Sequence, residues 1–142
     1  MIQSIHYKEI LKNKSLLEEY AKDCLVKGYN PQEQIYENMY TAGVLHCLGD
    51  YREGVLAGFV SIIVSVMPHN GNRIAVIESI FCLHEYRNLG IGFHLIQAAR
   101  DKAKDLGCDL ISYLPRIGSA FDKILEHRDS CLKTHVQYTE WL

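Results

Sequence analysis

Residues Val76 to Gly92 read V-I-E-S-I-F-C-L-H-E-Y-R-N-L-G-I-G, and this stretch decides the fold. It overlaps an apolar run, Ile74 to Leu83, of the kind that forms a buried strand. A polar patch follows, and from Ile91 onward apolar residues recur at helical spacing. The stretch therefore predicts a strand, a short basic and glycine-containing turn, and the start of a helix.

The turn has the composition of an anion-binding loop. Its residues are Arg87, Asn88, Leu89, Gly90, Ile91 and Gly92. A turn into a helix aims several backbone N–H groups at one point, where the helix dipole adds partial positive charge. The two glycines leave room for an anion to approach the backbone closely. Arg87 adds a charged, forked donor that suits phosphate. We interpret Arg87 to Gly92 as a cradle for a diphosphate.

Two common nucleotide-binding motifs do not fit this turn. A dinucleotide fold needs G-x-G-x-x-G, but Phe93, His94 and Leu95 follow Gly92, so the third glycine is absent. A nucleotide P-loop needs G-K-[ST] after the second glycine, which is absent too. A different phosphate-binding domain remains an alternative, as does an ordinary strand–turn–helix link with incidental glycines.

The pattern R-x-x-G-x-G after a strand with an acidic residue resembles motif A of the GNAT superfamily, the acyl-CoA-dependent N-acyltransferases. The stretch is also similar to that family's form I-E-x-I-F-V-x-P-x-Y-R-x-x-G-I-G, with Cys82 in place of Val and His84 in place of Pro. The resemblance implies acetyl-CoA as co-substrate, with its pyrophosphate in the cradle. It also implies that the backbone of Phe81, Cys82 and Leu83 binds the pantetheine arm and polarises the thioester carbonyl.

Glu78 is the candidate catalytic residue. It is the one charged residue between Ile74 and Leu83, and a carboxylate in an apolar strand is costly to bury unless it is paired or lines a wet cleft. The resemblance implies that an acid here faces the acceptor amine, so Glu78 is expected to bind the amine and to deprotonate or orient it. The alternative is a residue that points outward from a half-solvated strand.

Tyr36 and Tyr40 are candidate substrate-binding residues. They share the apolar stripe of a helix expected to begin at Asn30-Pro31 and to end at Gly43. Core packing alone would explain them. The resemblance, however, implies that the first two helices border the acceptor cleft, where a tyrosine provides a polar-tipped wall.

The general acid expected from the resemblance is missing. The family often carries a tyrosine on the helix after the fifth strand, and Leu125 stands at the corresponding position. His127, Tyr138 and Tyr113 are the nearest alternatives in the sequence, and release of the thiolate without assistance is the other, since the pKa of a free thiol is about 8.5.

The whole chain predicts a single GNAT-like domain, residues 1–142, of the α+β class, with three layers and a mixed central sheet. The predicted order is β-α-α-β-β-β-α-β-α-β. The expected strands cover Ile2 to Tyr7, Val44 to Tyr51, Val55 to Val66, Arg73 to Leu83, Cys108 to Leu114 and Cys131 to Leu142. The expected helices end at Gly28, Gly43, Gly107 and His127. The three strands between Val44 and Leu83 are joined by short turns and are expected to form an antiparallel meander. The helix that follows is a crossover, so the strand Cys108 to Leu114 is expected to run parallel to its neighbour.

Composition narrows the function classes. The net charge of −2 provides no field for nucleic acid or a membrane surface, and no apolar run approaches the length of a spanning helix. Five scattered cysteines without a C-x-x-C pair favour reduced thiols and a cytoplasmic protein. The seven histidines show no paired ligand spacing, so no metal is expected.

These observations predict a cytoplasmic N-acetyltransferase that uses acetyl-CoA and a primary amine, either a small molecule or a peptide. A non-catalytic acyl-CoA-binding or regulatory module is the alternative. Too few residues follow Cys131 for the two-stranded hairpin that usually ends the family's fold, so the last strand is expected at a sheet edge. An exposed edge can pair with a copy of itself, which leads to the hypothesis of a homodimer through Cys131 to Leu142.

Overall fold

The computed structural model describes residues 1–23 and 29–142. Its strands are β1 (Ile2–Ile5), β2 (Leu45–Arg52), β3 (Val55–Val66), β4 (Arg73–Cys82) and β5 (Leu110–Ser112). Its helices are α1 (Tyr7–Leu11), α2 (Lys14–Asp23), α3 (Glu33–Thr41), α4 (Ile91–Asp105) and α5 (Ala120–Glu126), with a 3-10 helix, η1 (His84–Leu89), between β4 and α4. The stop expected at Gly28 lies outside the described residues.

The described strands form one mixed sheet in the order β1-β2-β3-β4-β5. Neighbouring strands from β1 to β4 run antiparallel. Short turns join β2 to β3 and β3 to β4, whereas α1, α2 and α3 lie between β1 and β2 in the chain. The long helix α4 carries the chain back across the sheet, so β5 pairs with β4 in parallel. The predicted meander and parallel crossover are therefore confirmed.

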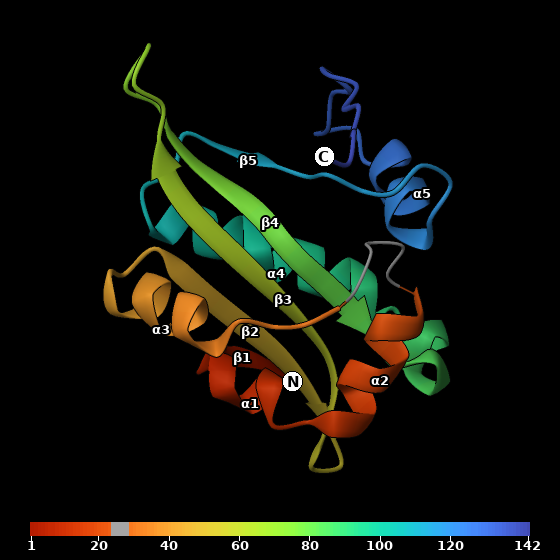
Figure 1. Ribbon diagram of the computed structural model, residues 1–142. Helices are drawn as coiled ribbons and strands as arrows, with labels where there is room; N and C mark the ends of the chain where they lie inside the picture. Colours follow the sequence, from red (N-terminus) through yellow and green to blue (C-terminus); the bar gives the residue numbers. More distant parts are fainter. Residues whose placement is uncertain (24–28) are drawn as a thin grey trace.

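Helices cover both faces of the sheet (Figure 1). On one face α4 packs through Ile91, Leu95, Ala99 and Ala103, which recur every four residues and are all buried. On the other face lie α1, α2 and α3, with Tyr7, Leu16 and Phe59 at the centre of a second buried cluster. The α+β class with three layers is confirmed.

The first helical region is divided in two. α1 ends at Leu11 and α2 begins at Lys14, and between them the Asn13 side chain accepts a hydrogen bond from the Leu16 amide at 3.2 Å. The third helix starts later than Asn30 and Pro31 predict: its first residue is Glu33 and the residue before it, Gln32, makes no side-chain cap. The end near Gly43 is confirmed, since the helix stops at Thr41 and Gly43 has φ +74°.

The expected last strand is wrong. Residues 131–142 contain no regular element and pair with none of the described strands. The apolar alternation of this tail is real, but a strand needs a neighbour to accept its backbone hydrogen bonds. The tail instead leaves its large apolar side chains exposed, namely Leu132, Val136, Tyr138, Trp141 and Leu142. Among the described residues no helix is long and apolar enough to cross a membrane.

Candidate functional site

Strand β4 outlasts its partner β5. The parallel pairing runs from Ile74↔Leu110 to Val76↔Ser112, and β4 then continues to Cys82 beside β3 alone. Among the described strands, none pairs with the outer edge of residues 77–82. The two parallel strands therefore separate towards their C-terminal ends, and the opening between them exposes backbone N–H and C=O groups to a ligand.

The opening leads to the start of α4. The residue before the helix, Gly90, has φ +74°, a left-handed conformation that glycine adopts without strain. No side chain caps the helix, and its first turn contains no acidic residue. The first N–H groups of an α-helix have no acceptor within the helix, so they and the dipole attract an anion. The cradle predicted from the sequence therefore lies at an uncapped helix start without an acidic residue, an environment that suits an anion.

The other residues of the predicted cradle contribute unequally. The side chain of Ile91 is fully buried in the core against the sheet, so only its backbone faces a ligand. Asn88 and Leu89 belong to η1 and are exposed. Arg87 is the cationic side chain of this loop, and its guanidinium lies over the Phe81 ring at 5.3 Å.

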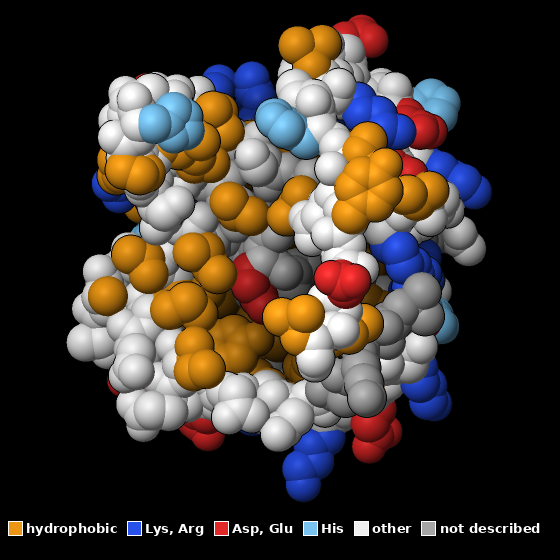
Figure 2. Space-filling view, turned by 45° about the horizontal axis from the view of Figure 1, so that its top comes forward, with side chains coloured by type: hydrophobic (Ala, Val, Ile, Leu, Met, Phe, Trp, Pro, Cys, Tyr) orange, Lys and Arg blue, Asp and Glu red, His pale blue; other side chains and the backbone are white. Residues whose placement is uncertain are grey.

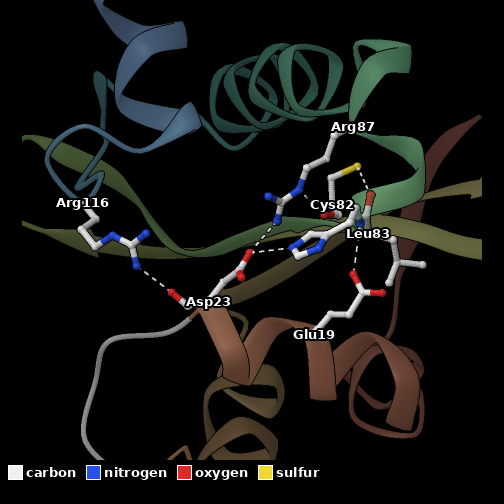
Figure 3. Close-up of polar contacts among 7 residues, drawn as sticks. Glu19, Asp23, Cys82, Leu83, Arg87 and Arg116 are labelled. Atoms are coloured by element: carbon white, nitrogen blue, oxygen red, sulfur yellow. Dashed lines mark hydrogen bonds and ion pairs between the residues drawn. The ribbon is translucent and has the colours of Figure 1, made fainter.

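Arg87 is held by groups at the end of β4 and on α2 (Figure 3). Its Nε donates to the Cys82 carbonyl oxygen at 3.1 Å, and its Nη2 donates to Asp23 Oδ2 at 2.6 Å. Asp23 also accepts from His84 Nε2 at 3.0 Å, in the tautomer or charge state that carries a proton there. Hydrogen bonds from His84 and Arg87 lower the pKa of the Asp23 carboxyl, so it is a carboxylate at neutral pH.

The Cys82 thiol plays no nucleophilic part in this arrangement. The side chain is buried, and its Sγ donates to the Leu83 carbonyl oxygen at 3.4 Å. Burial raises the pKa of Cys82 to about 11, so the thiolate is scarce at neutral pH. The side chains of Phe81, Cys82 and Leu83 are all buried. The Leu83 amide donates to the Ala57 carbonyl oxygen at 2.9 Å, so this part of the backbone is bonded to β3.

Glu78 is the extra residue of a β-bulge in β4. Ser61 of β3 pairs with Ser79 and Ile62 pairs with Ile77, so Glu78 has no cross-strand partner. The bulge changes the alternation: Ile77 belongs to the core under α4, whereas Ser79 faces the side of α1, α2 and α3. Glu78 and Ser79 therefore lie together, and Ser79 Oγ donates to Glu78 Oε2 at 2.7 Å. A bulge of this kind re-aims a side chain without ending the strand.

An aromatic cavity adjoins this acid on the helical side of the sheet. Its lining comes from α1, α2, the segment before α3, α3 itself and the sheet: Tyr7, Ile10, Leu11, Tyr20, Tyr29, Tyr36, Phe59, Ser61 and Ser79. The Tyr36 hydroxyl donates to Glu78 Oε1 at 3.5 Å. Burial, and next the Glu78 charge, raise the pKa of Tyr36, so its hydroxyl stays protonated. Figure 2 shows the surface hollowed near its centre, with an acidic side chain in the hollow and hydrophobic side chains around it.

Tyr40 lies one turn further along α3 than Tyr36. Its ring contacts His6 at 4.2 Å and Tyr7 at 5.7 Å between centroids, and it is not part of the cavity lining. Tyr7 links the two tyrosines, because its ring stacks on Tyr36 and meets Tyr40 edge-on. The Tyr7 hydroxyl donates to Glu37. Of the two candidates on α3, the structure brings Tyr36 to Glu78 and places Tyr40 at the outer end of the aromatic row.

The candidate general acids lie in different surroundings. Leu125 is half-buried on α5, the helix whose Ile124 lies over Gly92. His127 ends that helix with its Nδ1 at 2.7 Å from the Lys123 carbonyl oxygen. Tyr138 is 91% exposed in the tail, far outside any core. Tyr113 directly follows β5, is half-buried against Phe121, and has its pKa raised by burial.

Sequence reasoning missed several residues of this region. Asp23 of α2 accepts from Arg87 of the cradle, and Arg116, from the segment after β5, donates to the Asp23 carbonyl oxygen. Tyr7, Tyr20 and Tyr29 line the cavity beside Tyr36. The abundance of tyrosine in the first forty residues was a signal for the second group. No local pattern marks Asp23, because its partner Arg87 is 64 positions away.

The chain matches one family model over most of its length. The model of the acetyltransferase (GNAT) family matches residues 14–120, which is most of the chain. A comparison with curated proteins found no match.

Solved structures of acetyltransferases share the fold over nearly the whole chain. The ribosomal-protein-alanine N-acetyltransferase from Brucella melitensis biovar Abortus 2308 has a TM-score of 0.76 at 23% identity, covering 99% of this chain and 98% of that one. Glucosamine-6-phosphate N-acetyltransferase from Arabidopsis thaliana has a TM-score of 0.75 at 16% identity, covering 99% and 97%. The aminoglycoside N-acetyltransferase AAC(6')-Iy in complex with CoA has a TM-score of 0.70 at 16% identity, covering 100% of both chains.

Proposed function

We propose that this chain, which belongs to the acetyltransferase (GNAT) family, transfers the acetyl group of acetyl-CoA to a primary amine by direct attack in a ternary complex. As a family member it is an acyl-CoA-dependent N-acetyltransferase. The observation that carries the proposal is the position of Glu78, bulged towards the aromatic cavity on β4, the strand that leads through η1 to the uncapped start of α4. An acceptor site and a donor site therefore adjoin along one stretch of β4.

The donor site is the opening between β4 and β5 together with the cradle. The α4 N-terminus and Arg87 would hold the diphosphate of CoA, which fits because the helix start has neither a capping side chain nor an acid. The backbone of Phe81, Cys82 and Leu83 would bind the pantetheine arm and polarise the thioester carbonyl. The outer edge of β4, left without a described partner strand beyond Val76, supports this assignment. Acetyl-CoA bound there supplies the acetyl group as a thioester.

The acceptor site is the hollow beside Glu78. The amine nitrogen attacks the carbonyl carbon, the carbon–sulfur bond breaks, and its electron pair leaves with sulfur. Glu78 accepts a proton from the amine, directly or through one water, and holds the amine in line. Tyr36 stays protonated beside it and orients the carboxylate, because burial and the Glu78 charge raise the pKa of Tyr36. Tyr40 is assigned to the outer end of the acceptor site, where a larger substrate would reach its exposed ring.

Tyr113 is the general acid that the geometry favours. It follows Ser112, the last residue of β5 to pair with β4, and so begins the far wall of the opening. Burial raises the pKa of Tyr113, which keeps its proton on the hydroxyl until a stronger base forms. The thiolate of CoA, with a thiol pKa of about 8.5, is a weaker base than tyrosinate, so a proton from Tyr113 assists release of the thiolate without being essential to it.

A panel of primary amines with acetyl-CoA, read by the release of free thiol, tests the proposal. The panel includes small-molecule amines and peptides, since the structural neighbours act on an aminoglycoside, a sugar phosphate and a ribosomal protein. We expect acetylation of at least one class. CoA binding without acetylation of any amine would contradict the proposal and favour a non-catalytic acyl-CoA-binding or regulatory module, a function consistent with Leu125 at the usual tyrosine position.

We also propose that the protein is cytoplasmic and forms a homodimer through Cys131 to Leu142. The scattered cysteines support the compartment. The tail forms no strand, so the support for the dimer is the exposed apolar side chains of the tail. Apolar surface of this kind, gathered in one segment, is typical of a contact with another chain.

A further inference from the structure

The fork of Arg87 is fully oriented in this structure. Its Nε is bonded to the Cys82 carbonyl oxygen at 3.1 Å, its face lies over Phe81, and its Nη2 points at Asp23 Oδ2 at 2.6 Å (Figure 3). The terminal group that a phosphate would need is therefore bonded to a carboxylate of the same chain.

The end of α2 is tied to both sides of the opening. Asp23 Oδ2 also lies 3.0 Å from His84 Nε2, and the Asp23 carbonyl oxygen accepts from Arg116 Nη1 at 2.6 Å. One turn earlier, Glu19 Oε2 accepts from the backbone amide of His84 at 3.1 Å. Arg116 comes from the segment after β5 and His84 from the start of η1, so the last turn of α2 lies between the two walls (Figure 3).

A carboxylate and a phosphate are alternative partners for the same guanidinium fork. The pair is also exchangeable, because the Arg87 and Asp23 side chains are 41% and 36% exposed and an exposed ion pair is weak. Two donors of the cradle region converge on one Asp23 oxygen, as they would on one oxygen of a phosphate.

We infer that Asp23 is an internal counter-anion of the cradle, which the diphosphate of CoA displaces from Arg87. The inference rests on the proposed function. Asp23 thus sets the affinity for CoA, and it lowers that affinity because part of the binding free energy is spent in breaking the Asp23–Arg87 pair. A residue that only positioned Arg87 for phosphate would have the opposite effect.

Calorimetric titration of CoA into the full chain and its Asp23→Asn variant tests the inference. Asp23→Asn keeps the size of the side chain and removes its charge, and we expect CoA to bind about two- to fivefold more tightly, the range given by an exposed ion pair. The gain should shrink as salt is raised. Glu18→Gln removes one charge from an exposed position of the same helix and serves as the control, with CoA affinity unchanged.

The Asp23→Asn substitution in Arg87→Ala protein distinguishes an effect of the Asp23–Arg87 ion pair from a general effect of the substitution on α2. In Arg87→Ala protein, Asp23→Asn should leave CoA affinity unchanged, since the group it releases is gone. Thermal melting confirms that each variant is folded, and Asp23→Glu, which retains the charge, should bind CoA within twofold of the parent. Equal or weaker binding by Asp23→Asn, with the parent binding CoA, would overturn the inference alone. Absence of CoA binding by both proteins would overturn the proposed function with it.

Discussion

The Tyr36 hydroxyl lies 3.5 Å from Glu78 Oε1, across the gap between α3 and β4. The two residues are 42 positions apart in the chain, and the bulge at Glu78 is what brings the carboxylate within reach of the helix. The contact joins the acid proposed to receive the proton of the amine to the aromatic wall proposed to bind the amine.

Glu78→Gln should abolish most of the activity without affecting the donor site. The amide keeps the size of the side chain but accepts no proton, so we expect the rate to fall by about 10²–10⁴ with a verified acceptor. CoA affinity, measured by calorimetry, should equal that of the parent. Glu53→Gln, in the exposed turn before β3, is the control and should leave the rate unchanged. A loss seen in KM alone would assign Glu78 to holding a cationic amine.

Arg87→Ala should weaken CoA binding by about 1.5–3 kcal/mol, the usual value of a hydrogen bond to a charged group. The pair with Asp23 reduces the net loss, so the lower end is expected. In thermal melts CoA and acetyl-CoA should stabilise the parent more than ATP or NAD does, because at equal concentration the ligand that binds the folded state more tightly stabilises it more. Stabilisation by ATP but not by CoA is the result that would remove the cradle from the donor site.

Tyr113→Phe should slow turnover about tenfold at most and leave CoA affinity intact, since the thiolate leaves tolerably without a proton. The effect should be larger with an acceptor for which acetyl transfer, rather than product release, limits the rate. Tyr138→Phe, in the exposed tail, is the matched control. Equal rates for the parent and Tyr113→Phe in single-turnover experiments would exclude Tyr113 as the general acid.

Asp50→Asn should destabilise the fold in a pH-dependent way. Asp50 is completely buried in β2, and Arg52 Nε and Nη2 both donate to its carboxylate at 2.9 Å. Burial would raise the pKa of Asp50, but the hydrogen bonds to the charged form outweigh it and the pKa is lowered. The carboxylate therefore stabilises the fold above the unfolded pKa of about 3.9, and this contribution is lost as the pH falls through the lower, folded value.

Urea unfolding of the parent and of Asp50→Asn at several pH values measures this contribution. We expect the variant to be less stable at pH 7 by about 1.5–3 kcal/mol, with the difference narrowing below pH ~4. A difference that stayed constant down to pH ~2 would show that the loss comes from packing rather than from charge.

The tail should mediate dimer formation. Light scattering at high protein concentration is expected to give twice the mass of the chain, and replacement of Val136 and Trp141 by serine should return the mass to that of a monomer. Both side chains are 64% exposed and belong to no core, so the replacements should not change the melting temperature. A monomeric parent protein would contradict the dimer.

The local features of the donor site were predictable because they depend on neighbours in sequence. The apolar run into β4, the glycine at the left-handed position and the four-residue recurrence of Leu95, Ala99 and Ala103 each encode their own conformation. The tail shows the limit of this reasoning. Its alternation is that of a strand, but whether a strand forms depends on a partner elsewhere, and the short β5 edge provides none.

For the acceptor site, the sequence predicted which residue would matter but not where its side chain would point. An acid in an apolar strand marked Glu78 as unusual, but the bulge that aims it depends on the register between β3 and β4, which no local pattern contains. Asp23 was missed for a related reason. It lies on the polar side of an ordinary amphipathic helix, and its role follows from contacts with residues 61 and 64 positions away.

The bulge also separates the chemistry required of a side chain from the packing required of the sheet, two demands that usually conflict in an enzyme. A residue in regular register shares its backbone conformation and its neighbours with the opposite strand, so a change of side chain there alters the packing of the sheet. Glu78 has no opposite residue, and its exchange leaves the pairs Ser61↔Ser79 and Ile62↔Ile77 in place. Position 78 can therefore carry a side chain that its chemistry requires, here the acid proposed to accept the proton of the amine, while the cross-strand pairs of the sheet stay in place.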